Sequence, residues 1–135
     1  MLNLQAPAPG AFCWLDLAAS DADSARAFYA RAFGWTFQDR EAAGGLFTVA
    51  SSAQGEMGSL YQLRQTHLSQ GVPSHWTPYV RVEDADATCR RLPRLGGQVI
   101  VQPFEIPGTA RIALVQDSVG AVLGLWQAHA KQGHG

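Results

Sequence analysis

The chain has 135 residues, 47% of them hydrophobic, which predicts one soluble globular domain. Ten basic and eleven acidic residues leave a net charge of −1, which argues against a nucleic-acid or anionic-membrane partner. The N-terminal residues lack the basic and apolar regions of a signal peptide, and no apolar run reaches membrane-spanning length. Cys13 and Cys89 show no metal-binding spacing, so free thiols and a cytoplasmic location are expected.

The first half predicts a strand, a helix and three further strands. "FCWLDLA" (12–18) is short and rich in aromatic and aliphatic residues, as strands are. Asp21 is a good N-cap, and apolar residues at helical spacing follow it until Gly34, where the helix is expected to end. The three strands are expected at residues 35–40, 45–51 and 57–63.

The second half predicts the same order of elements. "TPYVRV" (77–82) is the strand, and Asp84 is the N-cap of the helix. Pro93 removes an intrahelical hydrogen bond and clashes with the preceding turn, so the helix should bend or end near Leu92. Three strands are expected at residues 98–102, 110–115 and 121–127.

These two halves form an internal repeat. Asp-Ala-Asp at 21–23 recurs at 84–86, an offset of 63 (84 − 21), and "GSLYQL" (58–63) resembles "LGLWQA" (123–128). The predicted fold class is therefore α+β, with two βαβββ modules at about 10–64 and 74–128 in a single domain of residues 1–135. A flexible tail is expected over 129–135, including His129 and His134.

Three stretches resemble the vicinal oxygen chelate superfamily, which includes glyoxalase I, bleomycin- and fosfomycin-resistance proteins and extradiol dioxygenases. They are "FCWLDLAASDADSARAFYARAFGW", "HWTPYVRVEDADA" and "VQPFEIPGTARIALVQDSVGAVLGLWQ". The resemblance covers about residues 10–127 and is greatest to a glyoxalase-like branch with FCW-type first strands. It implies that the modules form a curved mixed sheet, a cup with the helices on its outer face. It also implies a homodimer.

The same resemblance bears on metal binding. In that superfamily, His, Glu or Gln side chains on the first and fourth strands of each module hold a divalent metal. The matching positions here are Trp14, Ser59, Thr77 and Gly124, none of which is a standard ligand. We therefore predict no metal and no cofactor. A displaced site that uses His75 with Glu56 or Asp16 is the less favoured alternative, because it offers few donors at the wrong spacing.

Strand alternation divides the remaining strand residues between two faces of the sheet. One face contains the four metal positions and every second residue from them along each strand. It mixes aromatic and polar residues: Phe12, Trp14, Asp16, Met57, Ser59, Tyr61, His75, Thr77, Tyr79, Arg81, Val122, Gly124 and Trp126. The opposite face is almost wholly apolar and should pack under the helices: Cys13, Leu15, Leu17, Leu60, Trp76, Pro78, Val80, Val82, Leu123 and Leu125.

From the mixed face we predict a site for a small aromatic or planar organic molecule, with Gly124 leaving room at its floor. The candidate ligand-binding residues are Trp14, Asp16, Ser59, Tyr61, His75, Thr77, Tyr79, Arg81, Gly124 and Trp126. A subunit interface is the alternative interpretation of this face, because interfaces are also enriched in aromatic residues and Arg.

If the chain is instead a metal-independent enzyme, His75, Tyr79 and Arg81 are the catalytic candidates for proton transfer and oxyanion stabilisation. Asp16 and Arg81 are expected to pair across the cup, as an ion pair or as a holder for an anionic ligand. Phe104 and Glu105 are expected in a loop that borders the pocket, with a solvated loop glutamate as the alternative.

Overall fold

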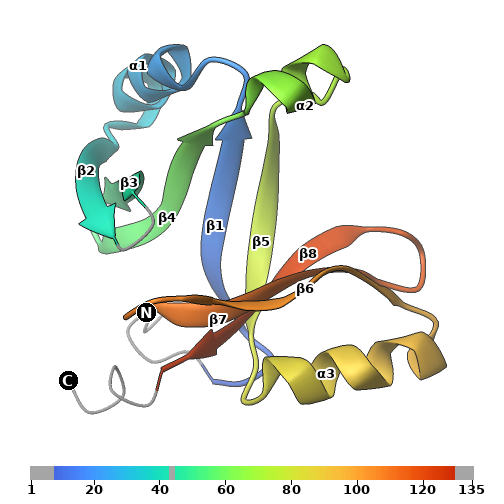
Figure 1. Cartoon of the computed structure of the whole chain (residues 1–135). Helices are drawn as coiled ribbons and strands as arrows, with labels where there is room; N and C mark the ends of the chain where they lie inside the picture. The colour runs from blue at the N-terminus through green and yellow to red at the C-terminus, as the bar shows by residue number, and fades with distance from the viewer. Residues whose placement is uncertain (1–7, 43–44, 130–135) are drawn as a thin grey trace. The chain divides into compact units, whose positions relative to one another are not determined.

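The computed structural model describes residues 8–42 and 45–129 (Figure 1). The described chain divides into two compact units. One is formed by residues 14–77 and the other by residues 8–13 together with 78–129. Each unit contains most of one βαβββ module, and each is described here by itself. Most of the predicted tail, residues 130–135, lies outside the described residues.

The first module has the predicted order of elements. They are β1 (Phe12–Ala19), α1 (Ala22–Phe33), β2 (Thr36–Ala42), β3 (Gly45–Ser52) and β4 (Gly55–Gln62), followed by a short helix α2 (Gln65–Ser69). The strand order is β2-β3-β4-β1, in which β1 and β4 are parallel and the other pairs are antiparallel. The helix α2 was not predicted, since its sequence is polar and lacks an apolar stripe.

The second module repeats this plan. Its elements are β5 (His75–Arg81), α3 (Ala85–Arg91), the 3₁₀ helix η1 (Leu92–Leu95), β6 (Gln98–Ile106), β7 (Ala110–Gln116) and β8 (Val122–Ala128). The strand order is β5-β8-β7-β6, and β5 and β8 are the parallel pair. The α+β class and the two βαβββ modules are thus confirmed (Figure 1).

The helix starts and stops also follow the prediction. Asp21 and Asp84 each accept a hydrogen bond from the backbone N–H three residues further on. Gly34 ends α1 in the left-handed conformation, with φ 73°. Pro93 lies inside the 3₁₀ turn that follows α3, so the second helix ends where the proline predicted.

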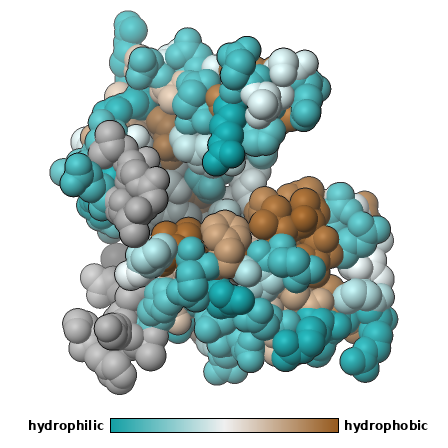
Figure 2. All heavy atoms as spheres, in the orientation of Figure 1, coloured by the Kyte–Doolittle hydropathy of each residue, from teal (hydrophilic) through white to brown (hydrophobic). Residues whose placement is uncertain are grey.

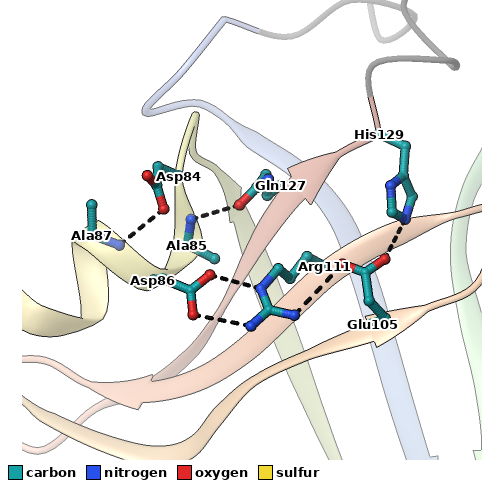
Figure 3. Close-up of polar contacts among 8 residues, drawn as sticks. All are labelled: Asp84, Ala85, Asp86, Ala87, Glu105, Arg111, Gln127 and His129. Atoms are coloured by element: carbon teal, nitrogen blue, oxygen red, sulfur yellow. Dashed lines mark hydrogen bonds and ion pairs between the residues drawn. The ribbon is translucent and has the colours of Figure 1, made fainter.

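The repeat extends to individual hydrogen bonds between helix and sheet. The backbone N–H of Ala22 donates to Gln62 Oε1, and the N–H of Ala85 donates to Gln127 Oε1, each over 2.8 Å. In both modules a glutamine at the end of the last strand therefore satisfies an N–H group at the helix start that has no partner within the helix. Figure 3 shows this arrangement in the second module.

The apolar face of each sheet packs under a helix, as predicted. In the first module Leu17 and Leu60 are buried against Ala25 and Tyr29 of α1. In the second module the core is formed by Cys89 of α3 with Ala113, Val115 and Leu125. Two members of the predicted apolar face, Leu15 and Trp76, nevertheless remain exposed.

Strand β6 corrects one prediction. Phe104 and Glu105 do not lie in a loop, because β6 continues to Ile106 and pairs with β7 over this stretch. The pairing with β7 shifts register between Val99 and Val101 and again between Val101 and Phe104, and the second shift spans Gln102 and Pro103. Such bulges allow a strand to accept a residue that lacks a backbone N–H. Figure 2 shows apolar side chains exposed over this strand.

His129, the first residue of the predicted tail, is the one tail residue among those the structure describes. Its half-buried imidazole has Nε2 2.8 Å from Glu105 Oε2. The two atoms are close enough for an ion pair, but the geometry does not meet the criteria for a hydrogen bond.

Among the helices that the structure describes, none is long and apolar enough to cross a membrane.

Candidate functional site

Five predicted site residues come together on one face of the compact unit of residues 14–77, which we call the Asp16 face: Trp14, Asp16, Ser59, Tyr61 and His75. Asp16 on β1 and Ser59 on β4 are direct partners across the parallel pair. The indole Nε1 of Trp14 donates to Ser59 Oγ over 2.9 Å, and Ser59 Oγ donates to Asp16 Oδ1 over 2.9 Å. The two hydrogen bonds therefore run in one direction, from the Trp14 indole to the Ser59 hydroxyl and from that hydroxyl to the Asp16 carboxylate.

The electrostatics of this face centre on Asp16. Burial raises its pKa to about 6, although the hydrogen bond from Ser59 and the charge of His75 both act to lower it. The pKa of Tyr61 is raised as well, first by burial and then by the negative charge of Asp16. A carboxyl group with a pKa near 6 can exchange a proton close to neutral pH.

His75 lies at the edge of this face rather than in its centre. Its side chain is exposed, and its Nδ1 is 2.9 Å from the carbonyl oxygen of Pro73. Because a carbonyl oxygen can only accept, Nδ1 is the donor in this contact. Its neighbour on the strand, Thr77, is buried.

In the second module, the positions equivalent to Asp16 and Ser59 are Tyr79 and Gly124, and the Tyr79 side chain fills the space there. Tyr79 is the direct partner of Gly124, as Asp16 is of Ser59. The Tyr79 ring lies over Gly124, so closely that a Cβ atom at this glycine would overlap it, and Tyr79 is only 5% exposed. Trp126 meets the ring edge-on, with centroids 6.1 Å apart. The prediction that Gly124 leaves room for a ligand is therefore wrong, because Tyr79 occupies that space.

Of the four positions that the resemblance matches to metal ligands, Trp14, Ser59 and Gly124 are engaged in other contacts. Trp14 presents an N–H donor that is directed at Ser59, and the Ser59 hydroxyl is itself directed at Asp16. Gly124 has no side chain and lies under the Tyr79 ring. Divalent metals require several converging N, O or S donors. Among the described residues, no group of three or more His, Cys, Asp or Glu side chains is placed to hold a metal.

A polar network in the second module had no counterpart in the sequence predictions (Figure 3). Arg111 on β7 binds Asp86 of α3 through two hydrogen bonds, of 2.7 and 3.0 Å, and lies 3.6 Å from Glu105. Arg111 lowers the pKa of Asp86. Asp86 and Arg111 are 25 residues apart on different elements, so no local spacing could have indicated the pair. The network joins α3, β6 and β7, and with His129 it fixes the end of β8.

The second module also contains a groove of about 530 Å³ between α3 and β6. It is lined by Asp86, Cys89, Arg90, Pro93, Gly97, Gln98, Val99, Gln102 and Pro103. None of these is a predicted site residue. Burial raises the pKa of the Cys89 thiol, which keeps it in its unreactive protonated form at neutral pH.

Comparisons with known proteins agree with this architecture. Among solved structures, methylmalonyl-CoA epimerase from Mycobacterium tuberculosis superposes with a TM-score of 0.64 at 17% identity, covering 94% of this chain and 93% of the epimerase. The Streptomyces coelicolor methylmalonyl-CoA epimerase gives a TM-score of 0.60 at 18% identity, covering 91% of this chain and 97% of the other. At such identities the similarity shows the fold alone.

Sequence relatives are more similar. The Mycobacterium tuberculosis protein named "Putative glyoxylase CFP32" is 33% identical over 118 residues, which are 86% of this chain and 45% of the relative. The anthracycline biosynthesis protein DnrV of Streptomyces peucetius is 33% identical over 137 residues, 93% of this chain and 50% of the relative. The chain spans about half the length of these curated relatives. A family model matches residues 12–125, and the chain therefore belongs to the glyoxalase/bleomycin resistance protein/dioxygenase superfamily.

Proposed function

We propose that the protein binds a planar, hydroxyl-bearing organic molecule on the Asp16 face. The observation that carries this proposal is the state of the Asp16 carboxyl group. Ser59 donates to Oδ1, while Oδ2 accepts no hydrogen bond from the residues that the structure describes. Oδ2 is not among the buried unpaired atoms of the described residues, so it is open to water or to a ligand, and a half-buried carboxyl group with a shifted pKa is often found at a binding or reaction site.

The neighbours of Asp16 suit a flat ligand. Tyr61 is exposed beside it and offers an aromatic surface, and Trp14 is held in place by its bond to Ser59. A ligand hydroxyl would donate to Asp16 Oδ2, and its ring would pack on these side chains, the usual combination of apolar wall and polar anchor. The relative DnrV is named for anthracycline biosynthesis. Anthracyclines carry fused planar rings with hydroxyl groups, which supports this ligand class.

The proposal is tested by measuring the affinity of a hydroxyanthraquinone and of the same ring without hydroxyl groups, by quenching of tryptophan fluorescence. We expect the hydroxylated ring to bind the wild type more tightly. Asp16→Asn should weaken binding by roughly tenfold or more, as expected for loss of a hydrogen bond to a charged group. The matched control is Asp39→Asn, since Asp39 on β2 binds Arg26 and Thr48 and takes no part in the Asp16 face. Equal affinities for the two rings, or an equal loss in both variants, would overturn the proposal.

A second candidate function is proton transfer without a metal. The observation that favours it is the Asp16 pKa of about 6, which suits a general acid or base at neutral pH. His75, whose charge acts on Asp16, could then pass protons to solvent through its exposed ring. Tyr79 and Arg81 stay as predicted catalytic candidates of the second module.

The two functions are distinguished by exchange with deuterated water. A bound compound that gains deuterium at carbon in the presence of wild type, but not of Asp16→Asn, would establish proton transfer. A compound that binds and gains none in either case supports a binding protein. Mass spectrometry of the recovered ligand provides the readout.

A further inference from the structure

The groove between α3 and β6 has one wall from a helix and one from a strand. Asp86, Cys89, Arg90 and Pro93 follow one another at spacings of three and one residues along α3 and the turn after it, so they share one side of the helix. The strand β6 contributes the opposite wall, between Gln98 and Pro103. The volume of about 530 Å³ lies within the range of sites that hold small organic molecules.

An irregularity of β6 shapes the strand wall of the groove. The second register shift, between Val101 and Phe104, leaves β6 with an extra residue relative to β7, which makes it a β-bulge. The two residues that this shift spans, Gln102 and Pro103, both line the groove. Bulges redirect side chains out of the regular alternation of a strand and are common beside binding sites. The bulge in β6 therefore has a local effect, which is to present these two side chains to the groove.

Three side chains of the lining have hydrogen-bonding groups to offer a ligand. They are Arg90 on α3 and Gln98 and Gln102 on β6, and with the residues that the structure describes none of the three forms a side-chain hydrogen bond or an ion pair. A guanidinium has five N–H donors, and each amide has both a donor and an acceptor. All three residues are exposed, so water satisfies these groups until a ligand replaces it.

Asp86, an acidic residue in the lining, is already paired. Arg111 donates to both oxygen atoms of its carboxylate, over 2.7 and 3.0 Å (Figure 3). Arg111 is also the main cause of the lowered pKa of Asp86, to which the charge of Arg90 adds a smaller contribution. The charge of Asp86 is thus balanced by Arg111, and Arg90 gives the groove a positive charge. The bidentate pair also ties α3 to β7, which holds the helix wall in place.

We propose that this groove binds a small organic carboxylate, with Arg90 as the partner of the carboxylate group. A guanidinium presents two parallel N–H donors to the two oxygen atoms of a carboxylate, a match that neutral polar groups do not reproduce. The hydrocarbon part of the ligand packs on Pro93, Val99 and Pro103, which supply the apolar part of the lining. Gln102 is placed to hydrogen-bond a polar substituent. Apolar walls with a few polar anchors are the usual composition of a small-molecule site.

This site is distinct from the Asp16 face. The groove lies in the compact unit of residues 8–13 and 78–129, whereas Asp16 lies in the unit of residues 14–77. The two sites also select different chemistry, because an arginine favours an anion and a carboxylate favours a hydrogen-bond donor. Binding in the groove is therefore independent of the function proposed above.

The first test is an NMR titration of the full chain with 2-naphthoate and with 2-naphthamide, its neutral counterpart. We expect the amide signals of α3 and β6 to shift, with a dissociation constant for naphthoate of about 1 mM or lower and binding of naphthamide roughly tenfold weaker. Arg90→Gln should weaken naphthoate binding roughly tenfold and remove its advantage over naphthamide. The matched control is Arg94→Gln, since Arg94 is an exposed arginine of η1 that does not line the groove. Equal affinities for the two compounds, equal losses in the two variants or an absence of saturable shifts would overturn the proposal.

The second test locates the site by filling it. Gln102→Trp places an indole in the groove and should weaken naphthoate binding roughly tenfold or more. Ile100→Trp is the control on the same strand, because Ile100 is 47% exposed and does not line the groove. Asp16→Asn should leave the affinity for naphthoate unchanged, and urea denaturation checks that each variant is folded. Undiminished binding in Gln102→Trp, or a loss in Asp16→Asn, would show that naphthoate binds elsewhere and would refute the proposed groove site.

Discussion

Replacing Asp16 by Asn should stabilise the protein at neutral pH. Burial raises the pKa of Asp16 from an ordinary value of 3.8 to about 6, so the folded protein binds the Asp16 proton more tightly than the unfolded chain does. The stability that this proton contributes is fully present below pH 3.8 and is lost as the pH rises through about 6. Above that range the folded state contains a carboxylate that would be better solvated in the unfolded chain.

The size of the effect follows from the two pKa values. Their difference, from 3.8 to about 6, corresponds to about 3 kcal/mol at about 1.36 kcal/mol per pKa unit. Because Asp16 is only partly buried, screening by water reduces the expected gain to about 2 kcal/mol. An asparagine has no charge to bury, and its Oδ1 can still accept from Ser59.

Urea denaturation of both proteins at several pH values between about 4 and 8 measures this gain. We expect nearly equal free energies of unfolding at the acid end and a growing advantage for Asp16→Asn between about pH 4 and pH 6. Two curves that stay parallel over this range, or a variant that is less stable at pH 7.5, would refute the reasoning. Ligand binding should fall in the same variant, so that stability and function change in opposite directions.

Three further predictions concern packing, capping and the polar network. Gly124→Ala should destabilise the protein by about 1–3 kcal/mol, because the added Cβ overlaps the Tyr79 ring; most of this loss in urea denaturation should vanish in a Tyr79→Leu background, and an unchanged loss would contradict the steric cause. Asp84→Ala and Asp21→Ala should each lower the free energy of unfolding by about 1 kcal/mol, since both cap a helix through the same bond; a loss in only one of them would contradict the equivalence of the modules. Because Arg111 lowers the pKa of Asp86, the stability that this pair contributes is present above pH 3.8 and is lost as the pH falls further. The thermal stabilities of wild type and Asp86→Asn should therefore converge in acid, and a constant difference would argue against the ion pair.

The sequence predicted the elements because their signals are local. Asp21 and Asp84 start the helices, and Pro93 ends the second one, through interactions with residues a few positions away. Strand alternation likewise assigned Asp16 and Ser59 to one face, and the structure shows that their strands are neighbours. The family's metal positions could be aligned for the same reason.

What could not be predicted depends on neighbours that are distant in sequence. Strand alternation put Tyr79 and Gly124 on the same face of the sheet. It did not predict that the tyrosine ring lies across the glycine. The direction of the Trp14, Ser59 and Asp16 hydrogen bonds and the raised Asp16 pKa depend on burial, which a residue pattern does not fix. The strand at Glu105 was missed because Pro103 is a loop signal unless bulges accommodate it.

Asp16–Ser59 in the first module and Tyr79–Gly124 in the second are equivalent pairs of residues, so the number of ligand molecules bound per chain depends on how they differ. A chain built from two copies of one module would be expected to offer two identical sites. Here the tyrosine ring takes the volume in the second copy that the first copy leaves to a serine and a carboxylate. If the proposed function holds, titration of the planar, hydroxyl-bearing ligand should therefore saturate at one molecule per chain, with Tyr79 and Gly124 in the second copy contributing to stability alone.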